Sequence, residues 1–375
     1  MKGRTVPAIT PLLLTMDAFG RKTPLGAVRK PALHPQRQRA FPLPWWEGVR
    51  WRGTRSTSTL ALPHPERGKS RGVAAVLCFG LVMTFLICAP HHLNAAQITD
   101  DRGAAVAVAA PPQRIVSLYG GLTEILSALG VGNRVVARIQ GDETIKGIPT
   151  VGTHLQPNVE MILALKPDLV VQGGVAKGMP ALARLEAAKV PVAMFAPRDF
   201  AGLFSTITRL GALTGRVEAA AALTRSMQAK LADVAGRVAN RPRPRVFFEV
   251  RELNLLAAGQ GSLVNDIITR AGGENLVTSP QKLTLYSLEA LIQANPEVYI
   301  IQQGPMNRSP EDIYTRPYFQ ELKAVKARRV LVVSESLYSR PGPRSAEAVE
   351  QLARFLHPEA WEKQGPGVRD QKKIN

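Results

Sequence analysis

Arginine and tyrosine residues follow several short apolar runs of this sequence after residue 113. The arginines are Arg138, Arg198, Arg251 and Arg340, and the tyrosines are Tyr119, Tyr286 and Tyr338. Guanidinium groups are planar donors that suit carboxylates, and phenol rings offer flat apolar faces. These residue types predict a binding site for a ligand that carries anionic oxygens. We expect two of the four arginines to touch it.

His154 is a further candidate for the same site. It is one of two histidines after residue 96, and it follows the pair Val151-Gly152. An imidazole at this point could line a cleft and contact a ligand, or it could lie outside the cleft. His357 follows an apolar helical pattern and precedes Pro358, so we expect it at the end of a helix.

Signals for catalysis or for a resident metal ion are missing after residue 96. This part of the chain has no cysteine, no GxSxG and no GxxxxGK[ST] motif. The segment Gly259-Gln260-Gly261-Ser262 lacks the third glycine of a dinucleotide-binding fingerprint. Two histidines cannot supply a zinc or manganese site. The sequence therefore predicts a binding protein with no catalytic residues, no cofactor and no metal ligands, rather than an enzyme.

Positive charge is concentrated near the beginning of the chain. The 375 residues carry a formal net charge of +19, of which +11 lies in residues 1–96. A balance this basic can indicate nucleic-acid binding. Because residues 1–66 match no recognition module and are rich in proline and arginine, we expect no nucleic-acid partner and interpret 1–66 as a non-structural upstream extension. A basic nucleic-acid-binding arm is the alternative.

Residues 67–96 have the pattern of a secretory signal peptide. Arg67, Lys69 and Arg71 precede the apolar run Val73–Ala89, and small residues follow at 95–96. The run has 17 residues and contains Gly80 and Thr84, which favours a cleaved signal over a membrane anchor. Lipid attachment at Cys88 is less favoured because Ile87 precedes it. We expect a periplasmic protein that begins near Ala96 or Gln97.

The rest of the chain alternates strand-like and helix-like segments, which is typical of α/β lobes with mostly parallel sheets. After a lead-in at 97–113, a first lobe is expected at 114–216 and a second at 241–360, with a tail at 361–375. Between the lobes, apolar residues recur at three- and four-residue steps from Val217 to Val238. This spacing predicts one long connecting helix over 217–240, ended by Arg241-Pro242. Ligands of open α/β sheets bind beyond the carboxyl ends of the strands, so the cleft between the lobes is the expected site.

A short internal repeat relates the two lobes. Residues 158–171 align without a gap on residues 287–300, and each copy contains a capping residue, a glutamate, a helix, a proline and an apolar strand. The alignment brings Glu160 and Glu289 to equivalent positions. The repeat supports two similar lobes.

Five segments carry a family resemblance. They are Arg114–Gly130, Val151–Val171, Ser262–Val277, Tyr286–Ile301 and Arg340–Glu359. In this order they resemble the periplasmic binding proteins of ABC importers for iron chelates and cobalamin, whose lobes are joined by a single helix. The resemblance implies a monomer that delivers a metal chelate to a permease dimer with its ATPase subunits, and so meets the membrane only through the permease.

The resemblance also implies roles for particular residues. Glu160 and Glu289 match the positions at which relatives dock onto arginines of the permease. Relatives that bind haem carry a tyrosine where this chain has Thr153, so the expected ligands are a ferric siderophore first, cobalamin second and haem third. An envelope enzyme on the same two-lobed fold is the alternative from another class. A connector made of one helix predicts modest lobe movement on ligand binding.

Overall fold

The computed structural model describes residues 95–174 and 178–362. The upstream extension at 1–66, both cysteines and nearly all of the expected signal peptide lie outside these residues, as does the tail after residue 362. None of the helices in the described ranges is both long and apolar enough to cross a membrane.

The first lobe is built on a four-stranded parallel sheet of order β4-β3-β5-β6. Its strands are β3 (Ile115–Ser117), β4 (Val135–Ala137), β5 (Leu169–Gly173) and β6 (Val192–Phe195), and a 3-10 turn η1 (Gly132–Arg134) precedes β4. Its helices are α2 (Gly120–Ala128), α3 (Val159–Ala164), α4 (Pro180–Ala187) and α5 (Phe200–Thr214). The carboxyl ends of the four parallel strands therefore meet at one edge of this lobe.

The second lobe has a six-stranded mixed sheet of order β10-β8-β7-β11-β12, with β9 paired to β7. The strands are β7 (Arg245–Arg251), β8 (Leu256–Ala258), β9 (Glu274–Asn275), β10 (Leu283–Leu285), β11 (Val298–Gln303) and β12 (Val330–Ser334). The helices and 3-10 turns are α7 (Leu263–Arg270), α8 (Leu288–Ala294), η2 (Phe319–Glu321), α9 (Lys323–Lys326), α10 (Glu335–Tyr338), α11 (Ser345–Leu356) and η3 (Pro358–Ala360). Strands β7, β9, β11 and β12 run parallel, whereas β8 pairs antiparallel with β7 and β10.

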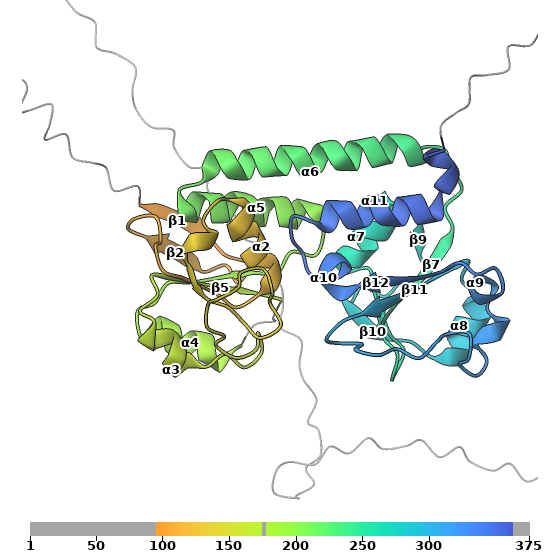
Figure 1. Cartoon of the computed structure of the whole chain (residues 1–375), viewed down its shortest axis with the longest axis horizontal. Coiled ribbons are helices and arrows are strands. Elements are labelled where there is room, and N and C mark those ends of the chain that lie inside the picture. Colours follow the sequence, from red (N-terminus) through yellow and green to blue (C-terminus); the bar gives the residue numbers. More distant parts are fainter. Residues whose placement is uncertain (1–94, 175–177, 363–375) are drawn as a thin grey trace, which may run out of the picture. The chain divides into compact units, whose positions relative to one another are not determined.

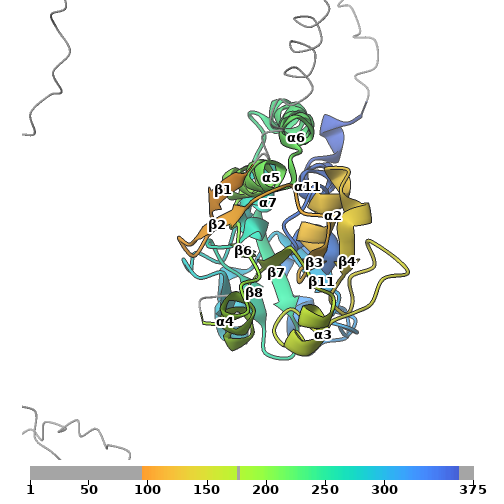
Figure 2. The same cartoon turned by 90° about the vertical axis from the view of Figure 1, so that its left-hand side faces the viewer.

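Helix α6 (Val217–Val238, 22 residues) joins the lobes, which confirms the expected architecture of two α/β lobes on one long helix. Figures 1 and 2 show α6 at the top above α5 and α11, with α3 and α4 on the far side of the first sheet. In Figure 1, α8 lies at the lower right, beside α9. One hydrophobic cluster includes Ile115 of the first sheet, Leu231 of α6 and Phe248 of the second sheet. The core is therefore continuous from one lobe to the other on the α6 side.

A hairpin of β1 (Ala96–Thr99) and β2 (Ala105–Val108) occupies the lead-in, where no strand was expected. Its turn covers the free edge of β6. The Asp101 amide donates to Met194 O at 3.0 Å, and the Met194 amide donates to Asp100 Oδ2 at 3.1 Å. Edge strands expose unpaired backbone groups, and such a cover prevents pairing with other chains.

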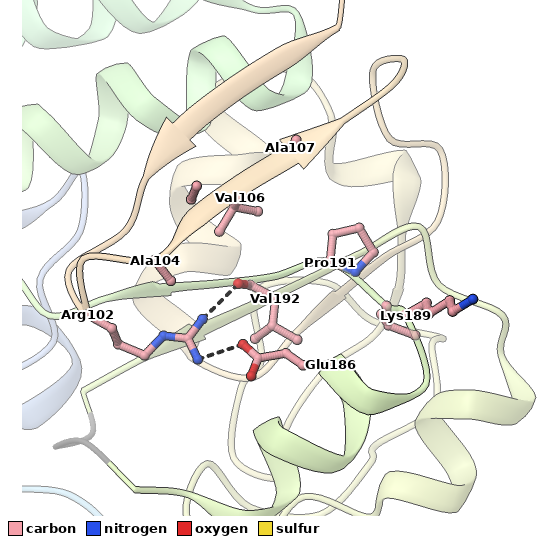
Figure 3. A pocket seen from close by; sticks show the side chains of 10 residues that line it. Arg102, Ala104, Val106, Ala107, Glu186, Lys189, Pro191 and Val192 are labelled. Carbon is pink, nitrogen blue, oxygen red and sulfur yellow. Dashed lines mark hydrogen bonds and ion pairs between the residues drawn. The ribbon is translucent and has the colours of Figure 1, made fainter.

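A small surface pocket of about 330 Å³ remains beside this hairpin, between β2 and the segment 189–192. In Figure 3, Arg102 reaches across it to Glu186 at 2.7 Å and to the carbonyl oxygen of Val192 at 3.0 Å. Because its arginine is already paired and it lies away from the strand ends of the lobe, this pocket does not have the features of the expected ligand site.

Candidate functional site

The ring of Tyr119 lies on bare backbone at the end of β5. A Cβ atom on Gly173 would lie 2.6 Å from Tyr119 Cγ, and one on Gly174 would lie 2.8 Å from Tyr119 Cε2. Side chains at these two positions would displace the ring. His154 meets the same ring edge-on, with ring centroids 6.2 Å apart. The structure thus brings two of the predicted site residues together at the carboxyl ends of β3 and β5.

Both side chains are half-buried and neutral at neutral pH. Burial raises the pKa of Tyr119 to about 12, with Arg340 opposing the shift and Glu335 adding to it. Burial also lowers the pKa of His154, and the positive charges of Arg340 and Lys282 lower it further. Since Arg340, Lys282 and Glu335 belong to the second lobe, the Tyr119–His154 pair faces that lobe across the cleft.

Two cations from opposite lobes influence each other in this cleft. Arg198 follows β6, and Lys282 precedes β10. Both side chains are exposed. Partial desolvation lowers the pKa of Lys282, and the positive charge of Arg198 lowers it further. In residues 95–174 and 178–362, neither Arg198 nor Lys282 forms an ion pair. Two such cations are suited to share an anionic group.

A cavity of about 590 Å³ opens next to Arg340, between α2 and the loop 141–144 of the first lobe and the ends of β11 and β12 of the second. Arg340 lies between the lobes there. Its Nη2 is 3.8 Å from Glu335 Oε1, and its Nη1 is 3.5 Å from the carbonyl oxygen of Gly141. The carboxylate of Glu335 also accepts the Met306 amide at 2.8 Å. Arg340 therefore lines the cleft but already has partners on both sides.

Three predicted residues are held by partners within their own lobe. Arg138 donates to the carbonyl oxygen of Asp142 and so supports the loop that follows β4. Arg251 donates to Asn254 Oδ1 at 3.1 Å, within its own turn. Tyr286 packs edge-on against Phe247, with centroids 5.3 Å apart.

Tyr338 has no exposed surface. It packs beside Phe248 at 6.0 Å between ring centroids, and its hydroxyl group has no partner in the part of the chain that the structure describes. The structure therefore offers no face of Tyr338 to a ligand. The reason is helix α10, which begins directly after β12 and directs this side chain into the core.

Two cleft residues were missed by the sequence analysis. Glu335 is the first residue after β12, so the rule that ligands meet strand ends could have identified it. Lys282 lies in a loop that enters an antiparallel strand, and no spacing in the sequence indicates its position. His357, expected at a helix end, is buried after α11 and within 3.2 Å of the carbonyl oxygen of Gly272.

The two glutamates of the repeat occupy equivalent helix starts. Asn158 Oδ1 accepts the Met161 amide at 3.0 Å before Glu160, and Ser287 Oγ accepts the Ala290 amide at 3.1 Å before Glu289. Both glutamates are exposed, in the first turns of α3 and α8. Arg184 lies 2.5 Å from Glu160 and lowers the pKa of its carboxyl group.

Within the described ranges, no cluster of three or more histidine, cysteine, aspartate or glutamate side chains is placed to hold a metal ion. The cleft instead combines an aromatic face, a neutral imidazole and several cations. Such a set can bind a polyatomic anion with a flat or apolar body.

The sequence pattern of the periplasmic binding protein family matches residues 115–337. The ABC transporter substrate-binding lipoprotein YvrC of Bacillus subtilis, itself uncharacterised, is 28% identical over 274 residues, which are 70% of this chain and 86% of YvrC. The match agrees with the resemblance found in the sequence.

Two solved structures show the same fold. The apo form of the periplasmic haem-binding protein RhuT from Roseiflexus sp. RS-1 superposes with a TM-score of 0.60 at 26% identity, over 66% of this chain and 99% of RhuT. The periplasmic vitamin B12-binding protein BtuF of Vibrio cholerae gives a TM-score of 0.58 at 25% identity, over 68% of this chain and 99% of BtuF.

Proposed function

Because this chain belongs to the periplasmic binding protein family, we propose that it captures a metal chelate bearing anionic oxygens and delivers it to the permease of an ABC importer. The chelate would lie between the lobes, against Tyr119 and His154 on one side and Arg340 on the other. No bond is made or broken in this role, so it requires neither a catalytic residue nor a cofactor.

The observation that carries the proposal is a pair of cations on opposite lobes, Arg198 and Lys282, which are near enough for Arg198 to lower the pKa of Lys282. Like charges held on opposite lobes repel each other, and an anionic ligand between them would turn this repulsion into attraction.

The positive charge of Arg198 and Lys282 favours a ferric siderophore with carboxylate or catecholate oxygens. Haem is the second candidate, because it carries two carboxylates and because the neutral imidazole of His154 lies beside Tyr119 in the cleft. The name of RhuT supports haem, and that of BtuF supports cobalamin. Cobalamin, placed second by the sequence alone, ranks third because it has less negative charge to offer the cations.

Replacing either cleft cation tests the ligand class. We expect Arg198→Met and Lys282→Met each to weaken binding of an anionic ferric chelate by about tenfold to a hundredfold, the value of a hydrogen bond to a charged group. Isothermal titration calorimetry with a ferric catecholate, ferric citrate, haemin and cyanocobalamin would measure the affinities.

Arg251→Met is the matched control, since Arg251 bonds to Asn254 in its own turn, and it should leave every affinity unchanged. Tight binding of cyanocobalamin alone, unaffected by either cleft variant, would contradict the anionic class. Tight binding of haemin that weakens in both cleft variants would reverse the order of the first two candidates.

We further propose that the protein is exported and that its mature form begins near Ala96. In the structure Ala96 already pairs with Val108 in the hairpin β1–β2, so a chain cut there retains the complete lobe. YvrC is named a lipoprotein, which makes lipid attachment at Cys88 the competing outcome.

Amino-terminal sequencing and intact-mass measurement of the protein from the cell envelope distinguish these outcomes. We expect a free amino terminus at Ala96 or Gln97. A mass that includes acyl chains on Cys88 would show lipid anchoring instead, and a protein that retains residues 1–66 would refute both.

A further inference from the structure

The start of α2 has no side chains where the second lobe approaches it. Gly120 and Gly121 are both buried, and a Cβ atom on Gly121 would overlap the carbonyl oxygen of Pro341. One on Gly120 would lie 3.4 Å from Arg340 Nη1. Gly342 comes equally close, since its own Cβ would lie 3.6 Å from the Cα of Gly121. The backbones of the two lobes therefore touch directly at this point.

The segment of the second lobe that makes this contact, residues 340–344, is stiff. It contains Pro341 and Pro343, whose φ angles are fixed by their rings. Ser345 also closes it into a turn, because its Oγ accepts the Gly342 amide at 3.1 Å and its own amide donates to Gly342 O at 3.0 Å. Pro341 and Gly342 are buried. This segment is a firm surface rather than a loose loop.

A bidentate ion pair holds the same two elements together one helical turn further along α2. Arg344 Nε lies 3.0 Å from Glu124 Oε2, and Arg344 Nη2 lies 2.7 Å from Glu124 Oε1. Paired, parallel contacts of this kind fix orientation as well as distance. The ion pair thus favours contact of the lobes, whereas the glycine contact limits how closely they can approach.

We propose that the contact between Gly120-Gly121 and residues 340–344 is a pivot that sets the angle between the lobes. The residue before the pivot in the first lobe is Tyr119, and the first residue of the pivot segment in the second lobe is Arg340. Both face the cleft, so a ligand that moves either side chain acts directly on the pivot. The inference concerns how the lobes are held and goes beyond the proposed ligand and transporter role.

Steric expansion of the pivot tests the proposal. In Gly121→Ala the two backbones must separate by about 1 Å to restore ordinary contact distances, and this change is larger at the far ends of the lobes. Spin labels at Ala187→Cys in α4 and Gln293→Cys in α8, which are both exposed, report it by pulsed electron paramagnetic resonance. Cys78→Ser and Cys88→Ser remove the native thiols from the full chain.

We expect Gly121→Ala to shift the mean label distance of the ligand-free protein by about 2 Å or more, as a rigid rotation of one lobe would. Gly236→Ala is the matched control, because a Cβ there meets nothing within 4 Å, and it should leave the distance unchanged. An unchanged distance in a folded Gly121→Ala protein would overturn the pivot.

If Gly121→Ala does not fold, Glu124→Gln with Arg344→Gln is the decisive variant. It removes the ion pair without adding volume, and we expect a broader distance distribution. A distribution as narrow as that of the original chain would refute the pivot. All these distances are measured without ligand, so a failure of the original chain to bind any metal chelate would count against the proposed function alone.

Discussion

Replacing both Glu160 and Glu289 by alanine is expected to reduce uptake at least about tenfold while leaving the affinity for the chelate unchanged. The two glutamates are exposed at equivalent helix starts of the two lobes. A permease built from two similar halves could bind one glutamate with each half, and opposite charges at two separate points would fix the orientation of the complex. Transport assays in cells, together with calorimetry on the purified variant, measure the two quantities separately.

The control for this experiment is another exposed glutamate in the first turn of a helix. Glu347 occupies that position in α11, so Glu347→Ala should leave both uptake and binding unchanged. Arg184→Ala is informative as well, because Arg184 pairs with Glu160 and a permease arginine that docks there would have to displace it. Docking should become no weaker when Arg184 is removed. Normal uptake by the double variant, or loss of chelate binding, would contradict the docking role.

Strand positions could be predicted from the sequence wherever a strand is buried on both faces. The apolar runs at 135–137 and 192–195 coincide with β4 and β6, because side chains of a parallel sheet enclosed by helices are apolar throughout. The hairpin β1–β2 was missed. Its strands are only four residues long, and its turn covers the edge of β6, which no local pattern reveals.

The start of α2 shows another limit of sequence reasoning. This helix begins at Gly120 and continues with Gly121. Glycine has low helix propensity, so local preference argues against this turn. The structure gives a reason for Gly121, because a Cβ there would overlap the carbonyl oxygen of Pro341, more than two hundred residues away in the chain.

Whether a residue lines the cleft depends on the direction of its side chain. The position of a residue after a strand does not determine that direction. Tyr119 and His154 were both predicted to line the cleft, and their rings meet edge-on in the structure. Tyr338 also follows a strand, yet the single turn of α10 directs it into the core. Lys282 reaches the cleft from a loop before β10, and only the antiparallel pairing of β10 with β8 fixes that loop.

Breaking a buried ion pair in the second lobe is expected to cause the largest loss of folding stability. Arg316 Nη1 lies 2.6 Å from Glu249 Oε2, and the Tyr299 hydroxyl donates to the same oxygen at 2.6 Å. Glu249 and Tyr299 have no exposed surface, and Arg316 is 3% exposed. Burial and the neighbouring Glu249 raise the pKa of Tyr299 well above its usual range, so the phenol remains a donor. Arg316 also donates to Glu311 O at 2.9 Å and thereby ties the long segment after β11 to the sheet.

We expect Arg316→Met to lower the free energy of unfolding by about 3–5 kcal/mol, because it leaves the carboxylate of Glu249 buried without its counter-charge. That is a large part of the stability of a typical domain, which is about 5–15 kcal/mol. Urea unfolding followed by circular dichroism would measure this loss.

Arg308→Met is the matched control, since Arg308 is exposed and has no ion pair in the described part of the chain. This variant should change the free energy of unfolding by less than about 0.5 kcal/mol. If Arg316→Met does not fold at all, Tyr299→Phe removes only the hydroxyl donor and should cost about 1–3 kcal/mol. Equal stability of the Arg316 and Arg308 variants would show that the buried pair does not stabilise the lobe.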